Sequence, residues 1–302
     1  MGNTILGIIG FGEVGGIFGR GLQGKEGVLA VHAWDLKFAG SEGAAASTRA
    51  SADGVTPSGS MAALCAEANM LISAVTASNT LAVAEEAARH LRPDTLFLDL
   101  NSASPGTKQR AAATIEAAGG HYVEAGVMTS VPPYGIRVPM LLGGAQAAEL
   151  SRTLTAWGMD ARPVSEKLGV ASAIKMSRSI MIKGLEALVI EAYTNARAYG
   201  VEEYVLPTLQ ETFPQIDWNK QGAYFFSRVV QHGKRRAEEM RESANTVKEA
   251  GFAPTMASAI AEKQDWVAGL AREGIFKDLT GQSPWQMYAD RLLAQRESDS
   301  DG

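Results

Sequence analysis

A glycine-rich stretch near the start of the chain, ILGIIGFGEVGG at 5–16, constrains the fold more than any other feature. Gly10, Gly12 and Gly15 are spaced as G-x-G-x-x-G, directly after an apolar run and before a helical pattern. In this motif the first glycine permits a tight turn, the second lets the backbone approach a pyrophosphate, and the third lets helix and strand pack closely. The stretch therefore predicts the phosphate-binding turn of a Rossmann-type dinucleotide-binding domain.

Short apolar runs alternate with alanine-rich helical patterns as far as about residue 165. Such alternation is typical of βαβ units around a parallel sheet. The expected strands are 4–9, 28–34, 70–75, 95–100, 121–123, 139–142 and 161–164. Helices are expected at 60–68, 78–91 and 105–118, the last with Ser104 as its N-cap.

Beyond residue 165 the pattern is helical nearly to the end of the chain. One stretch, 171–199, has apolar residues at three- and four-residue spacing and ends before Gly200, a typical C-cap. Further helices are expected at 203–212, 221–250, 256–273 and 284–295, followed by a frayed acidic tail at 297–302. We therefore predict an α/β Rossmann domain at 1–166 and an all-α domain at 167–302, joined by a long interdomain helix at about 171–199.

Composition argues against several classes of function. The 46% hydrophobic and 20% charged content is typical of a globular enzyme, and no apolar run approaches the roughly 18 residues needed to cross a bilayer. The net charge of -5 comes without a basic block, so we expect neither a nucleic-acid nor a membrane partner. Cys65 is the only cysteine and no signal peptide is recognisable, which favours the cytoplasm. No metal site is expected, because the histidines lack ligand spacing: His32, His90, His121 and His232.

Asp35 follows the expected strand 28–34, where an acid meets the adenosine ribose hydroxyls in Rossmann domains. A carboxylate there repels a 2′-phosphate, so NAD is favoured over NADP, although Lys37 leaves NADP open. A purely structural glycine turn and an ordinary loop aspartate are the alternative. The expected cofactor-binding residues are Gly10, Phe11, Gly12, Glu13, Val14, Gly15, Asp35, Val75, Thr76 and Asn101.

Four stretches, in this order, resemble the β-hydroxyacid dehydrogenase family, which includes 6-phosphogluconate and 3-hydroxyisobutyrate dehydrogenases. They are GFGEVGG at 10–16, DLNSASP at 99–105, EAGVMTS at 124–130 and GVASAIKMSRS at 169–179. From about Val201 the chain is similar to the helical domain of a less characterised, phosphogluconate dehydrogenase-like branch. The resemblance implies hydride transfer from the alcohol carbon of a small, anionic β-hydroxy acid to NAD(P), with or without decarboxylation. It also implies a homodimer formed through the helical domain.

The resemblance implies that Lys175, on the interdomain helix, is the general acid/base for the substrate hydroxyl. The family commonly has asparagine four residues later, where this chain has Ser179, whose hydroxyl can still bind substrate. Lys175, Ser179 and Lys183 lie in one row along a helix, so Lys183 is a candidate for a distal carboxylate or phosphate. The alternative for both lysines is a solvated helix surface.

Substrate contacts are also expected in two loops. Ser102 matches a position near the nicotinamide and the substrate, although serine is an ordinary loop residue. Many members have the motif D-x-x-V-S-G-G where this chain reads EAGVMTS at 124–130. The serine and both glycines of the motif are therefore replaced by other residues in this chain. Thr129 and Ser130 supply hydroxyl donors instead, and the change implies a different substrate shape.

His232 and Arg235 belong to a polar cluster within QHGKRRAEEM, which is either a solvated helix face or a group that closes the site on an anionic substrate. Two other functions stay open at this point. One is an imine reductase-like enzyme, although such relatives usually lack the helix lysine. The other is a nicotinamide-binding subunit without turnover, which the departures at 128–130 and Ser179 leave conceivable.

Overall fold

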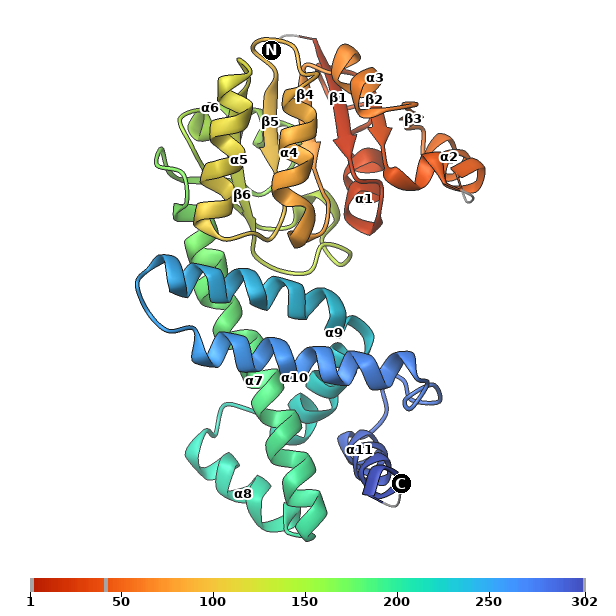
Figure 1. The fold of residues 1–302 in the computed structure, drawn as a ribbon, viewed down its shortest axis with the longest axis vertical. Helices are drawn as coiled ribbons and strands as arrows, with labels where there is room; N and C mark the ends of the chain where they lie inside the picture. The colour runs from red at the N-terminus through yellow and green to blue at the C-terminus, as the bar shows by residue number, and fades with distance from the viewer. Residues whose placement is uncertain (1–2, 41–42, 301–302) are drawn as a thin grey trace. The chain divides into compact units, whose positions relative to one another are not determined.

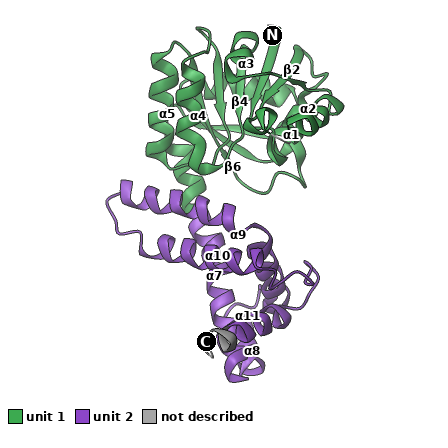
Figure 2. Ribbon diagram, turned by 45° about the vertical axis from the view of Figure 1, so that its right-hand side comes forward, with its two compact units in different colours: residues 1–177 green, residues 178–302 purple. Residues whose placement is uncertain are grey.

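A computed structural model describes residues 3–40 and 43–300 of the chain. It divides into two compact units, residues 1–177 and 178–302, which we call unit 1 and unit 2 (Figure 2). The division falls within one helix, α7 (Val170–Tyr199). The domain boundary expected between 166 and 167 stays a prediction.

The described strands of unit 1 form an eight-stranded sheet in the order β3-β2-β1-β4-β5-β6-β7-β8. Figure 1 labels β1 to β6 of this sheet. Neighbouring strands are parallel except for β6 and β7, which are antiparallel. The order 3-2-1-4-5-6 is that of a Rossmann fold, whose ligands bind beside the carboxyl ends of the strands where the order reverses, here between β1 and β4. The strands are β1 (Thr4–Ile9), β2 (Val28–Trp34), β3 (Thr56–Pro57), β4 (Met70–Ser73), β5 (Leu96–Asp99), β6 (His121–Val127), β7 (Met140–Gly143) and β8 (Ala161–Ser165).

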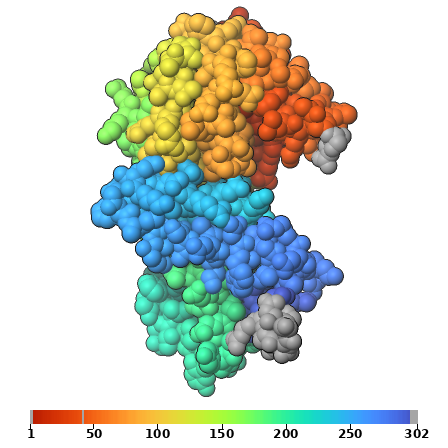
Figure 3. All heavy atoms as spheres, viewed as in Figure 1, coloured from red at the N-terminus to blue at the C-terminus, as the bar shows by residue number. Residues whose placement is uncertain are grey.

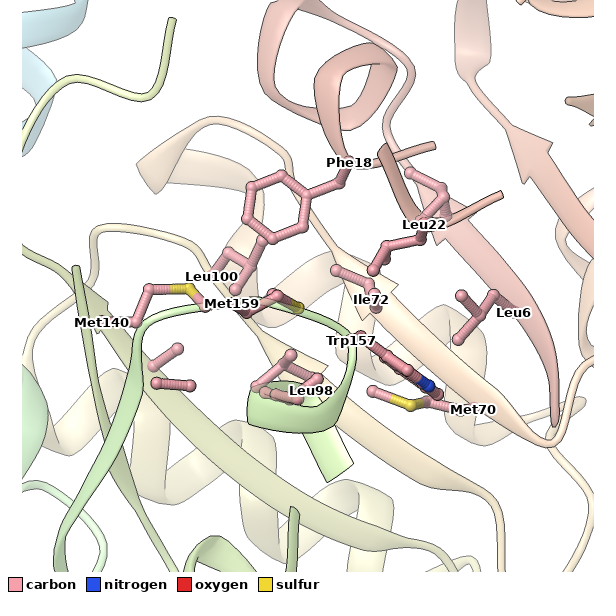
Figure 4. Close-up of a cluster of buried hydrophobic side chains, with 14 of the residues drawn as sticks. Leu6, Phe18, Leu22, Met70, Ile72, Leu98, Leu100, Met140, Trp157 and Met159 are labelled. Atoms are coloured by element: carbon pink, nitrogen blue, oxygen red, sulfur yellow. The ribbon is translucent and has the colours of Figure 1, made fainter. Parts of the chain in front are cut away.

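Helices cover both faces of this sheet. On one face, α1 (Glu13–Leu22) and α6 (Ala147–Ala156) bury apolar side chains against the strands, in a core that includes Phe18, Leu98 and Trp157 (Figure 4). On the other face lie α3 (Met61–Glu67), α4 (Thr80–Ala88) and α5 (Pro105–Ala117). Helices α4 and α5 pack side by side, as the orange and yellow surfaces show (Figure 3). The predicted fold class, an α/β Rossmann domain followed by a helical region, is confirmed.

Several parts of unit 1 differ from expectation, and they include helix α6, since no helix was expected at 147–156. Helix α2 (Gly43–Ala52) and β3 were not expected, because α2 buries only small residues and β3 is two residues long. Strand β6 continues to Val127, past the expected end at 123, because the charged Glu124 within it is buried and hydrogen-bonded. Strand β7 runs against its neighbour β6, which period-two patterning does not reveal.

Unit 2 is helical in all its described elements. After α7 come α8 (Glu202–Thr212), α9 (Trp218–Glu249), α10 (Thr255–Arg272) and α11 (Trp285–Ser300). Helices α9 and α10 lie side by side (Figure 1), and they approach closely because Gly233 faces the backbone of Gln264. The tail expected to fray from 297 is helical through Ser300, since no proline or glycine interrupts it; residues 301–302 lie outside the described residues.

Cys65 on α3 is fully buried, and this environment predicts slow thiol chemistry. Burial, and then the charge of Glu86, raise the pKa of the Cys65 thiol to about 11. At pH 8 we expect the native protein to react with a thiol reagent at least about 100-fold more slowly than the chain unfolded in guanidinium, because the reactive thiolate is scarce and covered. The absorbance of the released thiol measures the labelling rate. Equal rates for native and unfolded protein would contradict this expectation.

Candidate functional site

The turn between β1 and α1 has the geometry of a phosphate-binding loop. Gly10 has a φ of 88°, and a Cβ there would lie 2.7 Å from the Ala74 carbonyl oxygen. A Cβ on Gly15 would overlap the Gly10 carbonyl oxygen, so the helix can pack this close to the strand only without a side chain. Beside Gly12, in contrast, a Cβ would meet nothing within 4 Å. The open space at Gly12 is where a bound pyrophosphate approaches in this motif.

The amino end of α1 is suited to an anion. Gly12 is its N-cap, and no side chain caps the first amide groups of the helix. These N–H groups and the positive end of the helix dipole favour a phosphate. Glu13 is exposed and Val14 is half-buried on the first turn, whereas Phe11 is buried and packs against Phe38.

The Asp35 carboxylate braces this turn. One oxygen accepts the Phe11 backbone N–H at 2.7 Å, and the other accepts the Lys37 backbone N–H at 2.8 Å. Asp35 therefore holds the end of β2 against the glycine turn. Each carboxylate oxygen retains a further lone pair, so the side chain can still accept a ribose hydroxyl.

Asn101 links the carboxyl ends of β4 and β5. Its amide oxygen accepts the Val75 backbone N–H at 2.7 Å, and its amide nitrogen donates to the Ser73 hydroxyl at 2.9 Å. Asn101 is buried, and its side chain holds the loops after β4 and β5 together. Val75 and Thr76 follow β4, which is the neighbour of β1 in the sheet. The cofactor contacts expected of Val75, Thr76 and Asn101 stay predictions.

Below Asn101 lies a buried charged cluster that the sequence analysis missed. Asp99 accepts the Asn101 backbone N–H at 2.8 Å and the Tyr122 hydroxyl at 2.5 Å, and it pairs with Lys108 at 2.9 Å. Burial, and then the charge of Asp99, hold the pKa of the Tyr122 hydroxyl well above its usual value, so Tyr122 remains a donor. Asp99 at the start of DLNSASP was the only signal that could have located this cluster.

The structure brings Lys175 and Ser102 together although they are far apart in sequence. The Lys175 side-chain nitrogen Nζ lies 2.5 Å from the Ser102 hydroxyl oxygen, to which it donates. Ser102 follows the carboxyl end of β5, and Lys175 lies in the second turn of α7; both belong to unit 1. This pair therefore lies on the sheet edge that also carries the glycine turn.

The carboxyl end of β6 passes beside the first two turns of α7, and the chain continues from it into the loop that begins at Met128. A Cβ on Gly126 would lie 2.8 Å from the Ala171 carbonyl oxygen and 3.5 Å from the Lys175 Cβ. Thr129 is exposed and Ser130 is half-buried in this loop. Their substrate contacts stay predictions.

The other predicted substrate residues lie in unit 2, where α7 faces α9. Lys183 is buried, pairs with Glu239 at 2.9 Å and donates to the Ser179 hydroxyl at 3.1 Å. His232 is half-buried and Arg235 is exposed on α9, with the Arg235 Nε at 3.9 Å from Glu239. Lys183 is thus not a solvated surface lysine, and Glu239 already occupies its ammonium group.

A second buried ion pair lies in the same unit. Arg236 on α9 donates through Nε to a Glu186 carboxylate oxygen at 2.9 Å, and through a second nitrogen to the other oxygen. Gln264 on α10 donates to that Glu186 carboxylate at 3.3 Å. This polar network was also missed, since Glu186 stands alone in an apolar helical stretch.

Two further properties bear on the site. Within residues 3–40 and 43–300, no group of three or more His, Cys, Asp or Glu side chains is arranged to hold a metal ion. Across the same part of the chain, no helix has the length and apolar character required to span a bilayer.

Comparison with known proteins agrees with this geometry. Residues 5–153 match the NAD binding domain of 6-phosphogluconate dehydrogenase, and residues 196–267 match a domain of unknown function, DUF1932. A conserved hypothetical protein from Sinorhizobium meliloti 1021 is 38% identical, with a TM-score of 0.76 and 96% of each chain covered. A conserved protein described as structurally similar to 3-hydroxyacid dehydrogenases is 31% identical, with a TM-score of 0.67, covering 89% of this chain and 98% of its own.

The fold is shared more widely. The 3-hydroxyisobutyrate dehydrogenase of Mycobacterium tuberculosis, solved with L-serine, is 16% identical with a TM-score of 0.69, covering 97% of this chain and 99% of its own. Fold and site together define an NAD(P)-binding Rossmann protein with a helical second region. The chain belongs to the β-hydroxyacid dehydrogenase family, with a DUF1932 region in its C-terminal part.

Proposed function

We propose that this protein is an NAD(P)-dependent dehydrogenase that oxidises a small β-hydroxy acid, with Lys175 as general acid/base. The observation that carries the proposal is the 2.5 Å contact between the Lys175 Nζ and the Ser102 hydroxyl, on the sheet edge that bears the glycine turn. A lysine held by a hydroxyl partner has the fixed position that proton transfer requires. A solvated surface lysine would have no such partner in the protein.

The residues around the glycine turn fit a dinucleotide. Gly12 leaves open space, and the uncapped amides of α1 would hold the pyrophosphate. Asp35 would accept hydrogen bonds from the ribose hydroxyls. When bound, the nicotinamide supplies the hydride acceptor. What the protein itself contributes is the orientation of the substrate and the movement of a proton.

In the direction of oxidation, neutral Lys175 takes the proton of the substrate hydroxyl while the carbon loses its hydride. Ser102 keeps the lysine Nζ in place and offers its hydroxyl to the substrate. We infer that Thr129 and Ser130 bind the substrate carboxylate through their hydroxyl groups, and the substrate contact expected of Ser179 stays a prediction. In the reverse direction protonated Lys175 returns the proton to the carbonyl oxygen.

The ion pair between Lys183 and Glu239 bears on the size of the proposed substrate. A distal phosphate or carboxylate would have to displace Glu239 from Lys183, which would break a buried ion pair. We therefore propose a compact hydroxy acid without a distal phosphate; the substrate contacts expected of His232 and Arg235 stay predictions.

The test is a panel of β-hydroxy acids, with and without a distal phosphate, screened with NAD and NADP by nicotinamide absorbance. Turnover of a short hydroxy acid above the rate for phosphorylated ones is the expected result. Measurement of released carbon dioxide decides whether oxidation is followed by decarboxylation. If the purified protein binds the cofactor but reduces none of it with any member, a non-catalytic binding role replaces the proposal. Cofactor consumption with a ketone and an amine would instead favour an imine reductase.

Asp35 makes NAD the proposed cofactor. Asp35→Asn removes the charge that repels a 2′-phosphate but keeps the size of the side chain. We expect the ratio of the Kd values for NADP and NAD to fall at least about tenfold, equivalent to about 1.4 kcal/mol. Fluorescence titration with both cofactors measures it, and Asp53→Asn, which alters an exposed pair with Arg20, is the control. An unchanged ratio would remove Asp35 from cofactor selection.

A homodimer through unit 2 is also proposed. Met181 and Leu188 are 65% and 54% exposed, and with half-buried Leu185 they share one face of α7. A second copy would cover this apolar row. We expect Met181→Glu to shift the mass measured by light scattering towards the monomer, whereas Phe252→Glu, at an exposed position between α9 and α10, should not. A wild-type protein that is monomeric at all concentrations would contradict the proposal.

A further inference from the structure

The carboxylate of Glu124 lies under the first turn of α7, the helix that carries Lys175. One oxygen accepts the backbone N–H groups of Gly169 and Ala171 at 2.8 and 3.0 Å. The other accepts the Ser172 hydroxyl at 2.7 Å and its backbone N–H at 3.4 Å. The side chain is completely buried. Glu124 thus supplies, from the sheet, the acceptor that the unpaired amides of a helix start require.

The neighbouring strand is shaped around this carboxylate. Gly143 on β7 is the register partner of Glu124, and a Cβ there would lie 2.5 Å from the carboxylate oxygen that accepts Gly169 and Ala171. Gly143 does not have a positive φ, so backbone conformation alone does not demand glycine. The absence of a side chain at Gly143 therefore leaves the space that the Glu124 carboxylate occupies.

The same stretch of β6 packs directly on the lysine turn. Gly126 and Glu124 are two residues apart, so they face the same side of the strand. As described above, Gly126 meets the Ala171 carbonyl and approaches the Lys175 Cβ. The helix start is thereby held at two adjacent points of one strand, one through charge and one through close backbone packing.

Ser102, the partner of Lys175, is held by the adjacent strand. Asp99 on β5 is the register partner of Glu124 on β6, and it fixes the Asn101 backbone immediately before Ser102. Two fully buried carboxylates on neighbouring strands therefore hold the two halves of the Lys175–Ser102 pair separately. Displacement of either half by about 1 Å is enough to lower catalysis about 100-fold in other enzymes.

We propose that Glu124 is a positioning residue that sets Lys175 against Ser102 by holding the start of α7. Its significance for catalysis rests on the proposed function of Lys175. The competing explanation is that Glu124 stabilises the fold without affecting the pair. The two differ in what happens to Lys175 when the carboxylate is altered but the protein still folds.

The experiment uses the full-length protein with its lysines dimethylated by ¹³C-formaldehyde, so that Lys175 gives an NMR signal without any substrate. The signal is assigned by its loss in Lys175→Arg. In Glu124→Gln we expect it to move towards the position of solvent-exposed lysines, because one oxygen acceptor and the charge at the helix start are lost. Gly143→Ala, which crowds the carboxylate without changing it, should move the signal in the same direction. Ser172→Ala removes a single donor to Glu124 and should give a smaller shift.

A matched control is Asp217→Asn, which alters the carboxylate cap of another long helix, α9, and should leave the Lys175 signal in place. For a substrate found in the panel, Glu124→Gln should lower kcat about 30- to 100-fold while the Kd for the cofactor changes less than about twofold. Faster amide exchange at 169–172 with an unmoved Lys175 signal would overturn the proposal and leave a stability role. The milder Ser172→Ala decides the same question if Glu124→Gln does not fold. If no hydroxy acid is oxidised, the proposed function fails, whereas the NMR result still decides the position of Lys175.

Discussion

Lys175→Ala is expected to abolish turnover while cofactor binding persists. On the proposed function, this variant loses the group that exchanges a proton with the substrate hydroxyl, which should lower kcat on the order of 10²–10⁴-fold. The cofactor should bind normally, because the glycine turn and Asp35 are untouched. Steady-state kinetics and cofactor titration by fluorescence measure the two quantities on one preparation.

Two further variants separate proton transfer from charge. Lys175→Arg keeps a cation but cannot act as a base near neutral pH, so it should be nearly as inactive as the alanine variant. Ser102→Ala keeps the lysine and removes its partner at 2.5 Å, so a smaller loss of kcat is expected. Full activity of Lys175→Ala would exclude the mechanism.

Gly12→Ala and Gly15→Ala change the same turn but are expected to have different effects. The first should weaken cofactor binding, and the second should lower stability. A methyl group on Gly12 meets nothing in the protein, so stability should be unchanged while the pyrophosphate is pushed from the backbone amides. The Kd for the cofactor should rise about 10- to 100-fold, because charged hydrogen bonds contribute about 1.5–3 kcal/mol each.

Gly15→Ala places its methyl group on the Gly10 carbonyl oxygen, so backbone must move. Overpacking of this kind costs about 3 kcal/mol, which for a unit of this size lowers the Tm by about 6–12 °C. Calorimetry without cofactor distinguishes the two variants. A Gly12→Ala protein that melts early but binds normally would show that the turn is structural and does not hold a phosphate.

The strands of unit 1 could be predicted closely because apolar runs and glycine turns encode them locally. Strands β1 and β2 begin and end at the expected residues. Helix α2 and strand β3 escaped detection because α2 buries only Gly43, Ala46 and Ala50, which leave no apolar stripe. Strand β7 runs antiparallel to β6, and the direction of a strand relative to its neighbour cannot be predicted from its own pattern of apolar residues.

Sequence motifs indicate part of the candidate site, and the rest depends on tertiary contacts that the sequence does not show. Lys175 and Ser102 were both expected, on the resemblance, but their contact exists only once α7 meets the end of β5. Glu124 and Asp99 look like interruptions of apolar strands in the sequence. Their burial is tolerated because amides, hydroxyls and Lys108 surround them, and all of those come from other parts of the chain.

The residue numbers at which the two compact units divide have an evolutionary consequence. Lys175 and Ser102 both precede the division after Ser177, and so do both carboxylates that hold them. On the proposed function, a gene encoding this protein can therefore accumulate changes beyond that codon without altering the residues that exchange the proton or the carboxylates that hold them.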